Sequence, residues 1–136
     1  MWCQEWGSGT KRIGQWNGAI WLDRSGPTGT ANRIVVLSST DVWVMTYGVD
    51  GGFLWHWDGT QWSQKYQICK RENCLVQSLR VQNSNDIWAI VDGTVVHWDG
   101  TTWTSFALRH SQYDILTIGD DVWVSTQQGA IMHKKR

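Results

Sequence analysis

The sequence predicts an all-β chain built from successive copies of one small antiparallel unit. A spacing of 41 residues separates Trp16 from Trp57, and Trp57 from Trp98. The same spacing recurs among other tryptophans, namely Trp21, Trp62 and Trp103, and again between Trp2 and Trp43. Twelve tryptophans accompany a single proline, and no segment places its apolar residues at the helical period. A fixed period of about 40 residues indicates stacked copies of one supersecondary unit.

Two complete copies occupy the middle of the chain, at about residues 32–66 and 75–107. Each copy contains four short segments rich in β-branched and aromatic residues, which favour strands. The segments of the two copies are 33–38, 41–46, 52–59 and 60–63, and then 75–81, 86–91, 94–100 and 101–106. Turn residues separate the segments, so we expect each copy to fold as a four-stranded antiparallel sheet.

Partial copies flank the two complete ones. Residues 1–18 align without gaps on residues 42–59, so the fragment 1–24 supplies the second, third and fourth strands of a unit. The fragment 113–136 supplies the first, second and third strands of another unit. The sequence therefore predicts fourteen strands, grouped as three, four, four and three.

Aspartates mark turns in the two complete copies and in the last one, and Asn17-Gly18 takes their place in the first. Asp41, Asp86 and Asp121 stand two residues before a tryptophan of the second strand, where a carboxylate can accept backbone N–H groups and fix the turn. Asp58-Gly59 and Asp99-Gly100 lie between the third and fourth strands, and we expect type I′ turns there.

The repeating tryptophans and histidines have structural roles in this interpretation. Trp43 and Trp88 are expected to fill the space between neighbouring units, and Trp57 and Trp62 to pair across their hairpin. Three histidines recur at one position of successive copies, namely His56, His97 and His133. A catalytic group is normally a singleton placed among other singletons, so a residue that returns with the period serves the fold. We therefore predict no catalytic residue, metal site or cofactor, and no enzyme.

The repeat also carries a family resemblance. Four-stranded antiparallel units at this period are typical of a β-propeller. The segments Asp-Val-Trp at 41–43 and His-Trp-Asp-Gly-Thr at 56–60, followed by Trp62, resemble repeats of bacterial, often extracytoplasmic, β-propeller proteins. The resemblance covers roughly residues 1–133. It implies an incomplete ring of two full and two partial blades, forming a single domain over residues 1–136.

The incomplete copies lead to two expectations about assembly. The first unit lacks its innermost strand and the last unit lacks its outermost strand, so the chain is expected to be the C-terminal portion of a larger propeller. The competing hypothesis is self-association through the open blade edges, because unpaired strand edges are sticky.

A non-catalytic binding module, with a protein or carbohydrate ligand, is the function we expect. The loops of one rim vary while those of the other rim are constant, which suggests where a ligand would lie. Trp6, Tyr47 and Trp55 lie at the variable rim and are the candidate ligand-binding residues, although filling gaps between units is the simpler role. The alternatives are a fragment of a propeller enzyme of the sialidase or lyase kind, and a purely architectural domain.

Charge and cysteine content limit the classes of partner and the cellular compartment that the sequence predicts. The net charge is +0, which argues against a nucleic-acid partner. No apolar run of about 18 residues is present, so no membrane span is predicted. Cys69 and Cys74 flank a short connection and are expected either to form a disulfide, which would indicate an oxidising, extracytoplasmic or secreted setting, or to remain two surface thiols.

Overall fold

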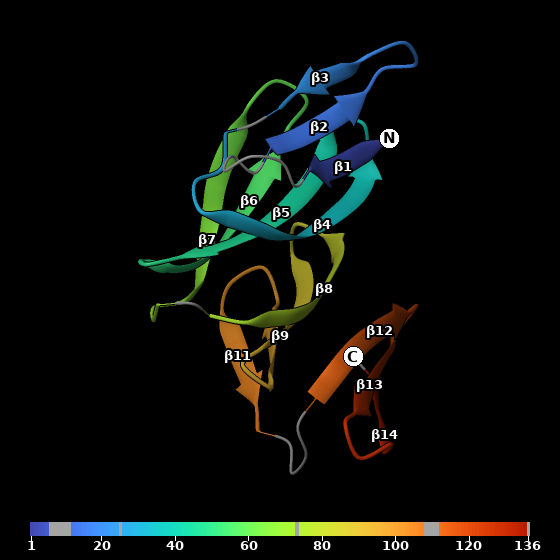
Figure 1. Cartoon of the computed structure of the whole chain (residues 1–136). Helices are drawn as coiled ribbons and strands as arrows, with labels where there is room; N and C mark the ends of the chain where they lie inside the picture. Colours follow the sequence, from blue (N-terminus) through green and yellow to red (C-terminus); the bar gives the residue numbers. More distant parts are fainter. Residues whose placement is uncertain (6–11, 25, 73, 108–111, 136) are drawn as a thin grey trace. The chain divides into compact units, whose positions relative to one another are not determined.

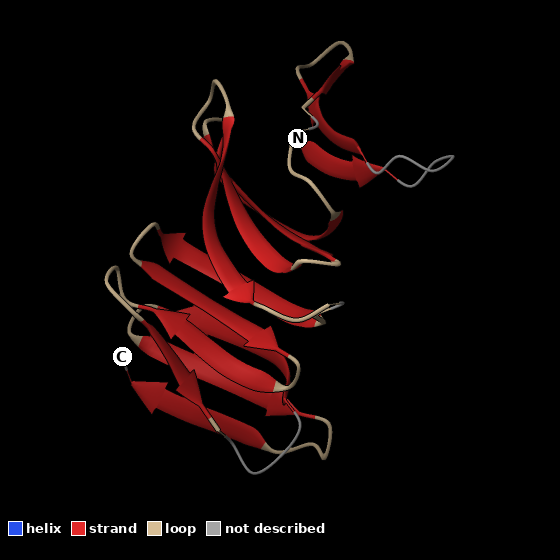
Figure 2. Cartoon of the chain, turned by 90° about the vertical axis from the view of Figure 1, so that its left-hand side faces the viewer, coloured by secondary structure: helices blue, strands red, loops and turns tan. Residues whose placement is uncertain are grey.

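The computed structural model describes residues 1–5, 12–24, 26–72, 74–107 and 112–135. Within these residues the chain contains fourteen strands and no helix, as Figure 2 shows by colour. The strands form four antiparallel sheets of three, four, four and three strands, each in sequential order (Figure 1). The all-β prediction and the predicted grouping of strands into β-propeller blades are confirmed. The described part of the chain accordingly offers no helix that could cross a bilayer.

We call the four sheets blades 1 to 4. The strands of blades 1 and 2 are β1 (Trp2–Glu5), β2 (Arg12–Trp16), β3 (Trp21–Asp23), β4 (Thr30–Ser38), β5 (Asp41–Gly48), β6 (Gly51–Trp57) and β7 (Trp62–Cys69). The strands of blades 3 and 4 are β8 (Val76–Asn83), β9 (Asp86–Val91), β10 (Thr94–Trp98), β11 (Trp103–Phe106), β12 (Gln112–Ile118), β13 (Asp121–Thr126) and β14 (Ile131–Lys135).

The chain divides into two compact units, residues 1–73 and 74–136. Unit 1 contains blades 1 and 2, and unit 2 contains blades 3 and 4, so each unit joins one complete blade to one three-stranded blade. The prediction that all four blades form a single domain stays a prediction.

Each unit is held by the same type of contact between its two blades. We call the side of a blade that carries its repeating tryptophan (Trp2, Trp43, Trp88 or Trp123) the front face, and the opposite side the back face. Residues on either side of the tryptophan in the strand point to the back face, because side chains alternate along a strand. In both units, the front face of the first blade packs on the back face of the second.

In unit 1, Trp2 and Ile13 of blade 1 pack against a cluster on blade 2 that includes Val42, Val44 and Trp57. The ring of Trp2 meets the rings of two blade 2 tryptophans edge-on, at centroid distances of 5.8 Å to Trp57 and 6.0 Å to Trp62. Trp57 and Trp62 are themselves paired across the hairpin at 5.5 Å, as the sequence predicted.

In unit 2, Trp88, Ile90 and Val95 of blade 3 form the core with Ile115, Val122 and Val124 of blade 4. Trp88 thus fills the space between two blades, as predicted for this position. Polar contacts join the first strands of the two blades, since Ser78 Oγ donates to Asp114 Oδ1 at 2.6 Å and Arg80 pairs with the same carboxylate at 3.3 Å.

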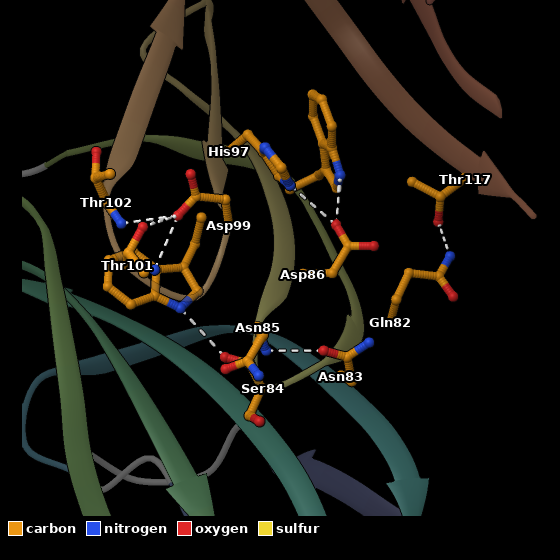
Figure 3. A network of polar contacts seen from close by, with 12 residues as sticks. Gln82, Asn83, Ser84, Asn85, Asp86, His97, Asp99, Thr101, Thr102 and Thr117 are labelled. Atoms are coloured by element: carbon orange, nitrogen blue, oxygen red, sulfur yellow. Dashed lines mark hydrogen bonds and ion pairs between the residues drawn. The ribbon is translucent and has the colours of Figure 1, made fainter. Parts of the chain in front are cut away.

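One carboxylate organises each of blades 2, 3 and 4. In blade 3, Asp86 Oδ1 accepts the indole N–H of Trp88 at 2.9 Å and lies 3.0 Å from His97 Nε2 (Figure 3). The imidazole of His97 stacks on the indole of Trp88, with the ring centroids 3.9 Å apart. The sequence predicted backbone partners for these aspartates; the structure shows that the carboxylate binds two side chains of the blade.

Blade 2 repeats the two contacts of the carboxylate, and blade 4 repeats the carboxylate–histidine contact and the stacking of the imidazole on the indole. In blade 2, Asp41 Oδ1 accepts the indole N–H of Trp43 at 2.8 Å and lies 2.9 Å from His56 Nε2. In blade 4, His133 Nε2 lies 2.6 Å from Asp121 Oδ1, and the imidazole stacks on Trp123 at 4.2 Å. The recurrence explains why aspartate, tryptophan and histidine return together with the period.

The turns between the third and fourth strands differ from the prediction. Asp99 Oδ1 accepts three hydrogen bonds, from the backbone N–H groups of Thr101 and Thr102 and from the Thr101 hydroxyl (Figure 3). Gly100 has φ of 95°, but Asp99 has no positive φ, so the type I′ turn expected there is wrong, because that turn needs positive φ at both central residues. The three donors favour the charged carboxylate and lower the pKa of Asp99 to about 2.

A type I′ turn occurs elsewhere, between β9 and β10. There Asp92 and Gly93 both have positive φ, at 50° and 75°. The Asp-Gly pair therefore marks turns correctly, but the loop around it decides the turn type.

Substitution Asp86→Ala is expected to destabilise unit 2 by about 1.5–3 kcal/mol, because it leaves the buried indole N–H of Trp88 and the N–H of His97 without their shared acceptor. Urea unfolding followed by tryptophan fluorescence measures the loss. Asp120→Ala, at an exposed position of the same unit, is the control and should change the free energy of unfolding little. Equal effects of the two substitutions would contradict the role of the shared carboxylate.

Substitution Thr101→Val is expected to raise the pKa of Asp99 from about 2 towards its ordinary 3.8, because it removes the hydroxyl donor and keeps the shape of the side chain. The depressed pKa of the wild type stabilises the fold above about pH 4, and this contribution is lost as the pH falls towards 2. A ¹³C carboxyl NMR titration measures the pKa, with Thr60→Val in the equivalent turn of blade 2 as the control that should leave Asp99 unchanged.

Candidate functional site

The structure separates the predicted ligand-binding residues. Trp6 lies outside the described residues. Tyr47, half-buried near the end of β5, pairs in register with Gly52, whereas Trp55 of β6 pairs with Val44. Positions 44 and 47 of one strand point to opposite faces of the sheet, so Tyr47 and Trp55 do not form one platform. Trp55 also donates its indole N–H to Thr46 Oγ1 at 3.1 Å, and a ligand-binding role for these residues stays a prediction.

Cys69 and Cys74 form a disulfide in the structure. Cys69 is the last residue of β7, and Cys74 is fully buried. A disulfide leaves neither sulfur as the thiolate that a zinc ion would need. Cys3 is a free, half-buried cysteine.

The charged and titratable groups considered from the sequence are engaged in the fold. His56 and His97 each contact an aspartate carboxylate and the ring of a tryptophan, which is tilted by 31° at His56 and stacked at His97. Burial of the imidazole lowers the pKa of His97 below its ordinary 6.5 and is the dominant effect on this group. A neutral ring whose Nε2–H donates to Asp86 satisfies both the burial and the 3.0 Å contact. Arg80, which a propeller enzyme could have used, pairs with Asp114.

The candidate site is an apolar cleft inside unit 2, between blades 3 and 4. Its volume is about 360 Å³. The lining residues are Trp88, Val95 and Phe106 of blade 3, and Val122, Val124, Met132, His133 and Lys134 of blade 4. A concave apolar surface with a few polar groups at its margin is the usual form of a binding site.

Comparison of the two units explains why the cleft exists. In the register of blade 4, Lys134 lies opposite Val122, just as Trp57 lies opposite Val42 in blade 2. A flexible lysine thus stands where unit 1 has the first ring of its tryptophan pair, and its ammonium group lies 4.1 Å above the ring of Phe106. The second ring of that pair, Trp62, comes from the fourth strand of blade 2.

Blade 4 has no fourth strand in the described part of the chain, so β14 is an edge strand, paired on one side with β13. Edge strands offer unpaired backbone N–H and C=O groups to another chain. The cleft and the open edge lie on the same strand, because Met132 and Lys134 of β14 line the cleft. An extended segment added to β14 could therefore insert a side chain where unit 1 has Trp62.

Sequence reasoning missed this site, although a signal was present. The repeat carries tryptophan at positions 16, 57 and 98 and lysine at the equivalent position 134. Lys135 and Arg136 likewise stand where Asp58-Gly59 follows Trp57 in the second copy. A departure from the period in the last blade was legible, but the cavity that results depends on the packing of blades 3 and 4.

Comparison with known proteins supports the fold. No protein-family model and no curated protein matches the chain. Among solved structures, YCF48 bound to D1 peptide matches with 22% identity and a TM-score of 0.58, covering 79% of this chain and 37% of that chain. YCF48 from Cyanidioschyzon merolae matches with 16% identity and a TM-score of 0.63, covering 91% of this chain and 44% of that chain.

Two further structures show the same architecture. One is the extracellular domain of a one-component system from B. thetaiotaomicron, with 16% identity, a TM-score of 0.61, and coverage of 91% of this chain and 20% of that chain. The other is the computationally designed Ika4 protein, with 14% identity, a TM-score of 0.61, and coverage of 91% and 79%. The chain spans less than half the length of either YCF48 structure, and the likeness establishes a β-propeller fold.

The stability of unit 2 is expected to fall as the pH drops below about 6.5, because the unfolded chain takes up a proton at His97 that the folded blade resists. The variant His97→Gln keeps a side-chain N–H for Asp86, and glutamine stands at the equivalent position 15 of blade 1. Urea unfolding of wild type and variant between pH 5 and pH 7 should show a flatter pH dependence for the variant. Parallel profiles would contradict a role for His97, because the two proteins differ only at that position.

Proposed function

We propose that the chain is a non-catalytic β-propeller interaction module that binds an extended polypeptide segment at the open edge of β14. The segment adds a fourth strand to blade 4 and inserts an apolar, preferably aromatic, side chain into the cleft lined by Trp88 and Phe106. The observation that carries this proposal is the 360 Å³ apolar cleft beside an unpaired strand edge, at the position that a tryptophan pair fills in unit 1.

The physical basis of the proposal is strand addition. Main-chain hydrogen bonds to the edge of a sheet supply affinity, and a pocket for alternate side chains supplies specificity. Phe106 and Met132 offer adaptable apolar contacts for the inserted side chain. Lys134 and Lys135 of β14 are exposed, which favours a segment with acidic residues beside its aromatic anchor.

Two further features support the proposal. One of the matched structures is described as YCF48 bound to D1 peptide, so a propeller of this architecture has been solved with a peptide. The Cys69–Cys74 disulfide favours an extracytoplasmic or secreted location, where oxidising conditions preserve such bonds. Self-association through open blade edges remains part of the proposal, since β14 would pair with a strand of a second copy by the same chemistry.

A peptide taken from the chain itself tests strand addition. Residues 99–107, which contain Trp103 and Phe106, form the outer strand of blade 3 and its preceding turn. The fluorescein-labelled peptide of this sequence should bind the protein saturably in fluorescence anisotropy. A peptide with serine in place of the tryptophan should bind about tenfold or more weakly, because burying an aromatic side chain contributes about 1.5–3 kcal/mol.

A matched pair of protein variants locates the binding site. Met132→Lys places a charge in the cleft and is expected to abolish peptide binding, whereas Ile131→Lys, on the other face of β14, should leave it intact. Thermal unfolding of both variants verifies that they are folded. Binding that survives Met132→Lys, or that does not depend on the tryptophan of the peptide, would refute the site.

A further inference from the structure

The front face of blade 4 is exposed where the same face of the other blades is buried. In each blade, one front-face residue lies two positions before the repeating histidine, or before Gln15 in blade 1. In blades 1 to 4 this residue is Ile13, Leu54, Val95 and Ile131, and its side chain is 4%, 0%, 2% and 72% exposed, respectively. The repeating tryptophans follow the same trend, because Trp43 and Trp88 are 1% and 2% exposed and Trp123 is 38% exposed. Leu116, which lies opposite Trp123 in the sheet, is also exposed. A hollow of about 300 Å³ lies along this face, lined in part by Leu116, Trp123 and Ile131.

The back face of blade 1 is the complementary open surface. In blade 2 this face carries Trp57 and Trp62, which receive Trp2 of blade 1. In blade 1 the equivalent pair is Trp16 and Trp21, whose centroids are 5.6 Å apart and whose side chains are 36% and 46% exposed. Together with Trp123, these are the tryptophans that the described residues leave substantially exposed.

The blade–blade contacts within units 1 and 2 show which kind of surface packs on a front face and which on a back face. In unit 1 a front face carrying Trp2 and Ile13 packs on a back face carrying a tryptophan pair, and in unit 2 a front face carrying Trp88 and Val95 packs on Val122 and Val124. We propose that the front face of blade 4 packs on the back face of blade 1 of a second copy of this chain. Trp123 and Ile131 of one copy then occupy the positions that Trp2 and Ile13 occupy in unit 1, against Trp16 and Trp21 of the other copy.

This interface is head-to-tail, because it joins two different faces of the same chain. Each copy therefore keeps one front face and one back face to offer to further copies. The proposal goes beyond the peptide site, since Ile131 and Met132 lie on opposite faces of β14 and the cleft is left free. The occupant is a second copy because this chain carries both halves of a contact that it already makes twice.

Size-exclusion chromatography with multi-angle light scattering tests the proposal on the whole chain. The wild type is expected to run as a dimer, or a higher multiple, at micromolar concentration. The variant Leu116→Lys/Ile131→Lys, altered on the front face of blade 4, and the variant Trp16→Lys/Trp21→Lys, altered on the back face of blade 1, should each run as a monomer. Val49→Lys, at an exposed apolar position of the β5–β6 turn, is the control and should assemble like the wild type.

Mixing the two monomeric variants tests whether the contact joins a front face to a back face. One intact front face and one intact back face remain in the mixture, so a heterodimer should form that neither variant forms alone. Circular dichroism of each variant, compared with the wild type, verifies the fold before mixing. A monomeric wild type, a front-face variant that still assembles, or folded variants that fail to combine would each overturn the proposal.

Discussion

A single carboxylate oxygen shared by two rings is the interaction on which the two complete blades depend. In blades 2 and 3 it accepts the N–H of the repeating indole and contacts the imidazole of the facing strand, and the imidazole lies against the indole, tilted by 31° in blade 2 and stacked in blade 3. The tryptophan is thereby fixed in one orientation, with its polar N–H satisfied inside the blade and its apolar surface presented on the front face. A ring held in this way can pack on a neighbour without leaving a buried polar group unpaired.

The fixed indole gives each blade two unlike faces, and unlike faces build a repeat. The front face projects a large ring, and the back face receives it on small β-branched side chains and on the tryptophan pair of the hairpin. Such a contact has a direction, so blades can follow one another but cannot stack face to face symmetrically. The same asymmetry leaves two unlike apolar surfaces exposed, the back face of blade 1 and the front face of blade 4.

Binding capacity arises where the repeat is broken rather than where it is kept. Lys134 replaces a tryptophan of the period, and β14 has no outer strand in the described part of the chain. The aspartates, tryptophans and histidines of the period are engaged with one another, and the groups that repeat are the least available for a ligand. The cleft lies where Lys134 stands in place of a tryptophan, and β14 is an edge strand of its sheet among the described residues.

The sequence by itself determined the strands, their grouping into blades and the partners Trp57 and Trp62, because these follow from a fixed period, from β-branched composition and from turns that span a few residues. It indicated that His56 and His97 serve the fold, but not how. Only the tertiary structure decided that Asp86 binds Trp88 and His97, that Tyr47 and Trp55 point to opposite faces, and that a cleft lies beside Lys134. Those features depend on which side chains distant strands bring together, and a periodic pattern records spacing along the chain but not the volume left between two packed sheets.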